Sequence, residues 1–266
     1  MPGGVFKAVI PAAGRGLRMR PFSLVLPKEM MSLGRKTMIQ LAVEEAIAAG
    51  IREICIVVRK GKEIIQTYLL NKDVRGAWQS CRLTFVQQKR WDGLGGALNA
   101  AKGFVGKDAF LMIIPDQFLV ARRFSASQQL VSQYDFKLPV VLSSMVRIPK
   151  NEANYFRGAR GFVTDTSVGR TRCPIVRLRT EWETRRAFDS MPYEVRGFGR
   201  TVFPAAIFPY LSRKYVNRKT GEIDLWKTFK KFPKTIPHFG CLLQGRACDL
   251  GTLEGYYHHL PLFVGQ

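Results

Sequence analysis

The chain has 266 residues, of which 46% are hydrophobic, and a formal net charge of +22 from 42 Lys and Arg against 20 Asp and Glu. This length and apolar content can bury a sizeable core, so we expect one globular domain over residues 1–266 and exclude a disordered chain. The basic charge favours anionic partners, among them nucleotides, sugar phosphates and nucleic acid. The five cysteines are scattered and odd in number, which argues against a disulfide framework.

The apolar runs of the sequence are too short to span a bilayer. The longest candidates, 110–115 and 202–211, are also broken or bounded by prolines. Near the N-terminus, Pro11 and Arg15 interrupt the only apolar stretch that a secretory leader could use. We therefore expect a cytoplasmic protein without a membrane partner.

Aromatic residues fall among basic ones in the segment 224–232. Their spacing fits the apolar face of an amphipathic helix better than a base-stacking platform. We therefore do not expect nucleic acid as a partner, although the net charge alone leaves it open.

The N-terminal stretch predicts a buried strand that leads directly into a basic, glycine-containing loop. Residues 5–10 are apolar and rich in β-branched side chains. Gly14 and Gly16 lack a Cβ, so the backbone can turn sharply and bring its N–H groups close to an anion. Basic side chains that could add charge-assisted hydrogen bonds follow: Arg15, Arg18 and Lys28. The loop is neither a Walker loop nor a dinucleotide fingerprint, and its spacing alone fits phosphate binding and an ordinary strand-to-helix turn equally well.

Strands and helices alternate in the first half of the chain. We predict a helix over 36–50, a strand over 53–58, a helix over 62–70, a strand over 82–88, a loop over 89–96, a helix over 97–102 and a strand over 110–114. This order predicts right-handed parallel α/β units. Asp116 follows the last of these strands, at the edge where open α/β sheets bind ligands, although a turn or helix-cap role explains it at least as well.

The second half is less regular. We predict a strand over 139–146, short strands within 158–179, a return to the core over 197–204, a short helix over 205–211, a helix opened by residues 220–226, and a final helix headed by Asp249.

A set of short stretches carries a recognisable pattern: 7–16, 27–30, 43–51, 85–88, 93–95, 111–116, 220–223 and 249–251. Together they closely resemble the bacterial UTP–glucose-1-phosphate uridylyltransferases, members of the sugar-nucleotide pyrophosphorylase group. The agreement is dense up to Asp116 and sparse beyond it. The resemblance implies an α/β fold of the nucleotide-diphospho-sugar transferase type, a three-layer, doubly wound and mostly parallel sheet that carries both substrates at its carboxyl edge.

The resemblance also assigns site residues. It places the nucleotide against Ala12, Ala13, Gly14, Arg15, Gly16, Gln88 and Gly93, with Gln88 and Gly93 hydrogen-bonding the base. It makes Arg18 and Lys28 the catalytic groups beside the triphosphate, and it matches Gly161 and Glu222 to sugar contacts. Asp116 and Asp249 would hold one Mg²⁺, for which carboxylates and phosphate oxygens are a suitable oxygen-only ligand set.

The implied reaction is nucleotidyl transfer, in which an oxygen of a sugar 1-phosphate attacks the α-phosphorus of UTP and pyrophosphate leaves. The attacking phosphate is already an anion at neutral pH, so the reaction needs no general base. Catalysis would come from alignment and from neutralisation of like charges.

The chain departs from the family mainly where the sugar phosphate would bind. The family has a glutamate and then a lysine there, and this chain has Arg177 and Leu178. Arg177 or Arg179 could supply the missing charge, but neighbours on a strand point to opposite faces, so Arg179 would need a bulge or a change of register. Three further departures are Leu17 for a threonine, Gln117 for an aspartate and Leu253 for a lysine.

These departures keep two alternatives open. One is a thymidylyltransferase that uses dTTP, and the other is a nucleotide-binding regulatory homologue that has lost transfer. The identity of the sugar and the presence of a homo-oligomer also stay open.

Overall fold

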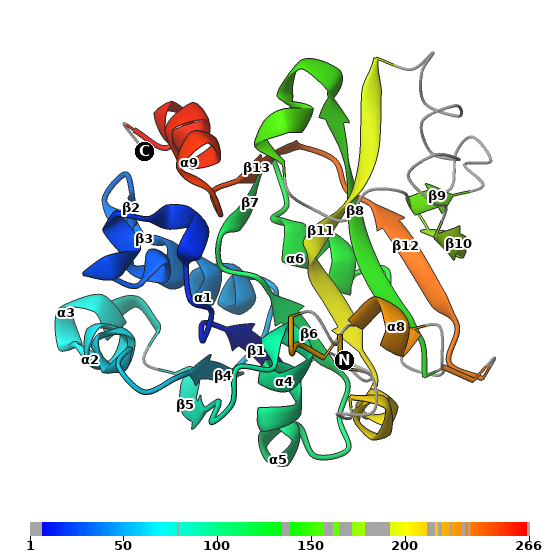
Figure 1. Cartoon of the computed structure of the whole chain (residues 1–266), viewed down its shortest axis with the longest axis horizontal. Helices are drawn as coiled ribbons and strands as arrows, with labels where there is room; N and C mark the ends of the chain where they lie inside the picture. The colour runs from blue at the N-terminus through cyan, green and yellow to red at the C-terminus, as the bar shows by residue number, and fades with distance from the viewer. Residues whose placement is uncertain are drawn as a thin grey trace.

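Figure 1 shows the fold in a computed structural model. The structure describes residues 7–78, 80–134, 139–156, 162–164, 172–178, 192–211, 216–217, 220–223, 225–229, 232–233 and 235–264. Within these ranges one sheet has nine strands in the order β5-β4-β1-β6-β11-β8-β12-β10-β9. Its strands are β1 (Lys7–Pro11), β4 (Glu53–Val58), β5 (Arg82–Gln87), β6 (Phe110–Ile113), β8 (Val141–Pro149), β9 (Phe162–Thr164), β10 (Arg172–Leu178), β11 (Tyr193–Phe203) and β12 (His238–Leu242).

The sheet is mostly parallel. β5, β4, β1 and β6 pair in parallel, and so do β8 and β12. β11 runs antiparallel to both β6 and β8, and β10 runs antiparallel to β12 and β9. Two small ribbons complete the strands, one of β2 (Ser32–Leu33) with β3 (Lys36–Thr37), the other of β7 (Gln117–Val120) with β13 (Arg246–Asp249).

Helices cover both faces of the sheet, because successive side chains of a strand point to opposite sides. In β4, Ile54 and Ile56 pack on one face, while Cys55 and Val57 pack on the other. The first face is covered by α1 (Met38–Ala48), α2 (Glu63–Leu70) and α6 (Ala126–Val131). The second is covered by α4 (Gly93–Ala100), α5 (Lys102–Val105) and the 3₁₀ helix η6 (Ala205–Tyr210), with α8 (Leu225–Phe229) beside them. The predicted three-layer, doubly wound α/β fold is confirmed.

The remaining helices are short. They are α3 (Lys72–Arg75), α9 (Leu253–His259) and the 3₁₀ helices η1 (Leu17–Met19), η2 (Phe22–Leu24), η3 (Lys28–Met30), η4 (Gly76–Trp78), η5 (Lys150–Tyr155) and η8 (Leu260–Leu262).

Two expectations from the sequence were wrong in detail. The segment 93–96 is helical rather than a loop, because its glycines are sites of close packing: a Cβ on Gly95 would lie 2.6 Å from Ile223 Cγ2. Asp249 is the last residue of β13 and does not head the final helix. That helix, α9, is capped by Thr252, whose hydroxyl accepts a hydrogen bond from Gly255 N (3.1 Å).

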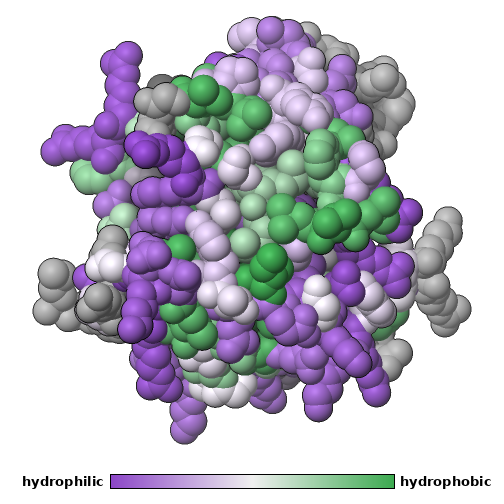
Figure 2. All heavy atoms as spheres, turned by 90° about the vertical axis from the view of Figure 1, so that its left-hand side faces the viewer, coloured by the Kyte–Doolittle hydropathy of each residue, from purple (hydrophilic) through white to green (hydrophobic). Residues whose placement is uncertain are grey.

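The surface beside the N-terminal loop is partly apolar. Figure 2 looks onto the left-hand side of Figure 1 and shows hydrophobic side chains gathered between hydrophilic ones. After β1 the loop exposes Leu24 and Val25, at 67% and 93%. None of the helices in the described ranges combines the length and the apolar character needed to cross a membrane.

Candidate active site

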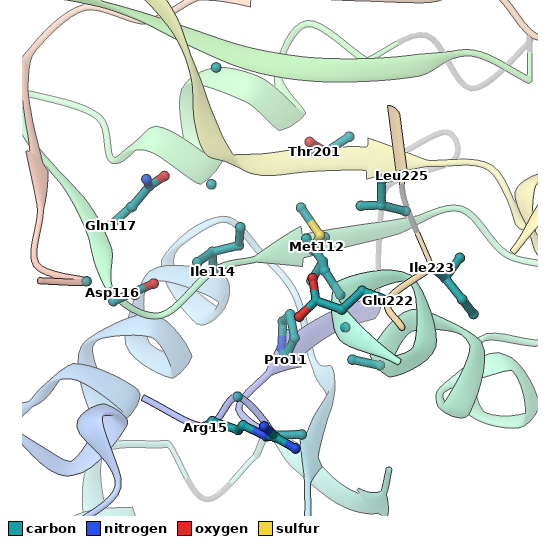
Figure 3. A pocket seen from close by; sticks show the side chains of 18 of the residues that line it. Pro11, Arg15, Met112, Ile114, Asp116, Gln117, Thr201, Glu222, Ile223 and Leu225 are labelled. Atoms are coloured by element: carbon teal, nitrogen blue, oxygen red, sulfur yellow. The ribbon is translucent and has the colours of Figure 1, made fainter. Parts of the chain in front are cut away.

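A cavity of about 950 Å³ opens at the carboxyl edge of the parallel strands. Its walls come from the loop after β1, the β5–α4 connection, the turn after β6, the middle of β11 and the segments around Glu222 and Asp249. Figure 3 shows Asp116 and Gln117 on one side of this cavity, and Glu222 and Ile223 on the other, with the Arg15 side chain below them. Strands and loops far apart in the sequence therefore converge on one site.

Most of the residues expected at the site line this cavity. They are Ala13, Gly14, Arg15, Gly16, Arg18, Lys28, Gln88, Gly93, Asp116, Glu222 and Asp249. Ala12 is fully buried beside them, and its carbonyl accepts a hydrogen bond from Lys62 Nζ (2.7 Å).

The expected sugar-phosphate residues are described only in part. Gly161 and Arg179 lie outside the described residues. Arg177 belongs to β10, and the register of β10 against β9 shifts between Ile175 and Arg177. Arg179 could take the place of the family's lysine only with a bulge or a change of register, and the observed shift lies in this part of the chain.

Lys28 and Asp116 form a buried ion pair at the Asp116 side of the cavity. Lys28 Nζ lies 2.5 Å from Asp116 Oδ2. Burial alone would raise the pKa of Asp116, but the Lys28 charge and its hydrogen bond lower that pKa below its ordinary value. Burial alone would lower the pKa of Lys28, but Asp116 and Glu29 raise it. Both groups therefore keep their charge at neutral pH.

Asp249 completes a pair of carboxylates beside Gly251. Gly251 N donates to Asp249 Oδ1 (3.0 Å), and Gln117 Nε2 donates to Asp249 Oδ2 (3.0 Å). A Cβ on Gly251 would stand 2.6 Å from Asp116 Oδ2 and 3.1 Å from Asp249 Oδ1. The two carboxylates therefore converge on the small space that the missing side chain leaves, and this oxygen-only donor set fits a hard cation such as Mg²⁺. Gln117, which replaces an aspartate of the family, orients Asp249 here.

Side-chain contacts hold the loop after β1 in place. Gly16 adopts a left-handed conformation (φ +70°), and its carbonyl accepts a hydrogen bond from Ser23 Oγ (2.7 Å). The Arg15 guanidinium lies 4.1 Å from the centre of the Trp91 ring, and that of Arg59 lies 4.4 Å from it. Trp91 thus holds Arg15 at the cavity wall through a cation–π contact.

The sequence did not predict two buried ion pairs that support this site. Glu29 and Lys62 form a buried pair at 2.7 Å, and Arg200 pairs with Glu45 at 2.6 Å. A lone arginine inside the apolar run 197–204 was the available signal, because a charge in a buried strand requires a partner.

Comparison with known proteins identifies the class. The nucleotidyl transferase family matches residues 7–156, more than half of the chain, so the chain belongs to the nucleotidyl transferase family. It is 29% identical to a UTP–glucose-1-phosphate uridylyltransferase of Bacillus subtilis (strain 168), over 95% of this chain and 88% of the relative.

Two solved structures have the same fold. UDP-glucose pyrophosphorylase complexed with UDP-glucose superposes with a TM-score of 0.77 at 24% identity, over 97% of this chain and 98% of that one. A UTP-bound UGPase from Acinetobacter baumannii gives a TM-score of 0.78 at 24% identity, over 97% of this chain and 93% of that one.

Proposed function

We propose that this chain, as a single domain, joins UTP and glucose 1-phosphate into UDP-glucose and pyrophosphate, with Mg²⁺ as cofactor. The observation that carries the proposal is the convergence of the Asp116 and Asp249 carboxylates beside Gly251, with Lys28 at 2.5 Å from Asp116, behind a basic glycine loop. The named relative is a uridylyltransferase and is similar over most of its length. The thiols of Cys55, Cys81 and Cys248 form no disulfide, which supports a reducing compartment such as the cytoplasm.

The proposed role of the loop after β1 is to hold the triphosphate. Gly14 and Gly16 let the backbone approach phosphate oxygens, and Arg15 and Arg18 offer guanidinium groups at the cavity wall. A guanidinium group presents a planar fork of N–H donors that matches the oxygens of a phosphate.

The proposed role of Lys28 is that of a fixed positive charge. Its raised pKa keeps the ammonium group protonated, so it neutralises phosphate charge and does not exchange protons. Asp116 and Asp249 would hold the Mg²⁺, which, when bound, would supply further neutralisation of the phosphates. A sugar 1-phosphate aligned by these charges needs no general base, because its phosphate is already anionic.

The sugar would lie on the Glu222 side of the cavity. Glu222 packs directly against the first turn of α4, since a Cβ on Gly93 would lie 2.7 Å from Glu222 Cβ. Arg177 or Arg179 would supply the charge for the sugar phosphate.

The test is a pyrophosphate-release assay with Mg²⁺, UTP or dTTP, and a panel of sugar 1-phosphates. We expect release with UTP and glucose 1-phosphate, and loss of it in Asp116→Asn by about 100-fold or more, since a charged group at the reacting phosphate is removed. Faster turnover with dTTP would replace the proposal by a thymidylyltransferase. Nucleotide binding without release for any sugar would instead identify a regulatory homologue.

A smaller effect is expected when Trp91 is removed. In Trp91→Ala, Arg15 loses its ring contact, so the Kd for UTP should rise about fivefold, while the Tm stays near that of the wild type. Isothermal titration of UTP measures this. Phe124→Ala is a matched control, because Phe124 also carries a cation–π contact, with Arg123, and its side chain is likewise 49% exposed, but it lies outside the cavity. Equal Kd values for the two variants would contradict the role of Trp91.

A further inference from the structure

We propose that Glu152, His258 and His259 form a binding site for a transition-metal dication such as Zn²⁺. Each of the three side chains offers one ligand atom, and these atoms all lie within 4.8 Å of one another. In the part of the chain that the structure describes, no other such group occurs. None of the three residues lines the cavity, so the site is separate from Asp116 and Asp249, the carboxylates proposed to hold Mg²⁺.

The fold brings the three side chains together from segments far apart in the sequence. Glu152 lies in η5, and two of the chain's three histidines are adjacent in α9. Gly255 lets α9 approach η5 closely, because a Cβ at this position would lie 3.1 Å from Tyr155 O. The Tyr155 ring stacks on His258, with ring centres 3.9 Å apart and an angle of 9° between the planes. Packing therefore fixes the His258 ring before any metal binds.

A buried ring nitrogen of His258 indicates that a ligand belongs here. His258 Nε2 is buried and has no hydrogen-bond partner among the described residues. A buried polar atom without a partner costs free energy, and each such atom in a folded protein calls for an explanation. Imidazole nitrogens are the commonest metal ligands in proteins, so a bound metal ion would give this atom its partner.

His259 is held in a tautomer that can bind a metal. Its side chain is 1% exposed, and Nδ1 lies 2.8 Å from Gly255 O. Because a carbonyl oxygen can only accept, Nδ1 carries the proton, and Nε2 keeps its lone pair. Burial lowers the pKa of His259 below its ordinary value of 6.5, although the hydrogen bond to Gly255 opposes this effect. The imidazole is therefore neutral at neutral pH, as metal binding requires.

Glu152 supplies the carboxylate, and Arg246 orients it. Arg246 Nη2 donates to Glu152 Oε1 (2.8 Å). A carboxylate has two oxygens, so Oε2 can bind a metal ion while Oε1 keeps this hydrogen bond. The Arg246 side chain is 45% exposed, so solvent and salt screen the repulsion between its charge and a bound cation.

Two imidazoles and one carboxylate define the class of metal. This ligand set suits Zn²⁺, with water in the fourth position, whereas Mg²⁺ requires oxygen ligands. A Zn²⁺ ion held by all three side chains joins α9 to η5. Since only the folded chain brings them together, binding stabilises the fold.

The experiment titrates untagged, chelator-treated protein with Zn²⁺ by calorimetry in excess Mg²⁺. We expect one strong Zn²⁺ site, with a Kd of about 1 μM or lower. Zn²⁺ at about 100 times this Kd should raise the Tm by about 5 °C. Because no nucleotide or sugar phosphate is present, the outcome does not depend on whether the chain is a transferase.

Two variants remove one ligand each. Glu152→Gln and His258→Phe should weaken Zn²⁺ binding at least about 100-fold, more than the loss of a residue that only orients a ligand usually does. Phenylalanine keeps the ring stack on Tyr155 and removes the unpaired nitrogen, so without Zn²⁺ this variant should have at least the Tm of the wild type. Glu194→Gln is the matched control, because Glu194 also pairs with an arginine, Arg196, but lies outside the cluster.

Asp116→Asn separates this site from the carboxylates in the cavity, and it should bind Zn²⁺ as tightly as the wild type. No Zn²⁺ binding by the wild type would overturn the inference, and so would equal Kd values for wild type, Glu152→Gln and His258→Phe. Loss of binding in Asp116→Asn would instead place the ion in the cavity and overturn it as well.

Discussion

Gly251→Ala is expected to lower kcat/KM for nucleotidyl transfer at least about 100-fold while the protein stays folded. The new Cβ would lie 2.6 Å from Asp116 Oδ2 and 3.1 Å from Asp249 Oδ1, too close for either oxygen to stay in place. Both carboxylates are held in place, Asp116 by Lys28 (2.5 Å) and Asp249 by Gln117 Nε2 and Gly251 N (3.0 Å each), so a shift would break these contacts. Gly251 is not among the glycines with positive φ, so alanine adds no backbone strain there.

The effect of Gly251→Ala should appear in how the rate of pyrophosphate release depends on the Mg²⁺ concentration. We expect the Mg²⁺ concentration for half-maximal pyrophosphate release to rise in Gly251→Ala, while calorimetry without Mg²⁺ shows UTP binding close to that of the wild type. Gly103→Ala in α5 is the control, because no atom lies within 4 Å of its added Cβ. If the two alanine variants turned over equally fast, the carboxylates would not act together at Gly251.

Local patterns of the sequence were sufficient to predict the strands and helices of the first half of the fold. The strand at 53–58 was predicted with its observed bounds, and the helix predicted over 36–50 is α1 at Met38–Ala48. The first two residues of the predicted range, 36 and 37, form β3 and pair with β2 instead. Gly50 adopts the positive φ that a helix C-terminus favours. These elements are set by periodicity and capping, which act over a few residues.

Contacts between distant segments could not be predicted in the same way. The position of Asp249 depends on the pairing of β13 with β7, and the Asp249 carboxylate is oriented by Gln117, more than 100 residues away in the chain. Nothing in the sequence near Gln88 shows that Asp92 accepts a hydrogen bond from its amide, since the contact depends on the shape of one turn and on a glycine at 96. The proposed role of the 175–179 segment in sugar-phosphate binding stays a prediction.

The second large effect is expected from Arg200→Met, which should lower the free energy of unfolding by about 3–5 kcal/mol. Arg200 is fully buried, and each of its five N–H groups has an acceptor. Nε and Nη2 donate to Glu45 (2.9 and 2.6 Å). The other donors reach backbone carbonyls of Ile114 (2.9 Å), Gly199 (3.1 Å) and Gln117 (2.8 Å). Methionine would leave the Glu45 carboxylate without its counter-charge, with only its hydrogen bonds from Ser127, and would remove the arginine donors from these three carbonyls.

The stability that Arg200→Met loses should become smaller as the pH falls. Burial alone would raise the pKa of Glu45, but Arg200 and the hydrogen bonds from Ser127 lower it below the ordinary value of 4.5. A lowered pKa stabilises the fold fully above pH 4.5, and the gain is lost as the pH falls through the folded-state pKa. Denaturant unfolding of wild type and Arg200→Met should therefore differ most near neutral pH and converge in acid. Arg246→Met breaks the more exposed pair with Glu152 and should cost about 1 kcal/mol or less.

A double variant separates stability from the positioning of the site. In Glu45→Met/Arg200→Met no charge is left unpaired, so most of the stability should return. The carbonyls of Ile114 and Gln117, which flank Asp116, still lack the donors that fix this turn. Turnover should therefore stay reduced, by about tenfold, because a small displacement of Asp116 misaligns the reacting phosphates. Full recovery of kcat together with stability would mean that Arg200 stabilises the fold without positioning Asp116.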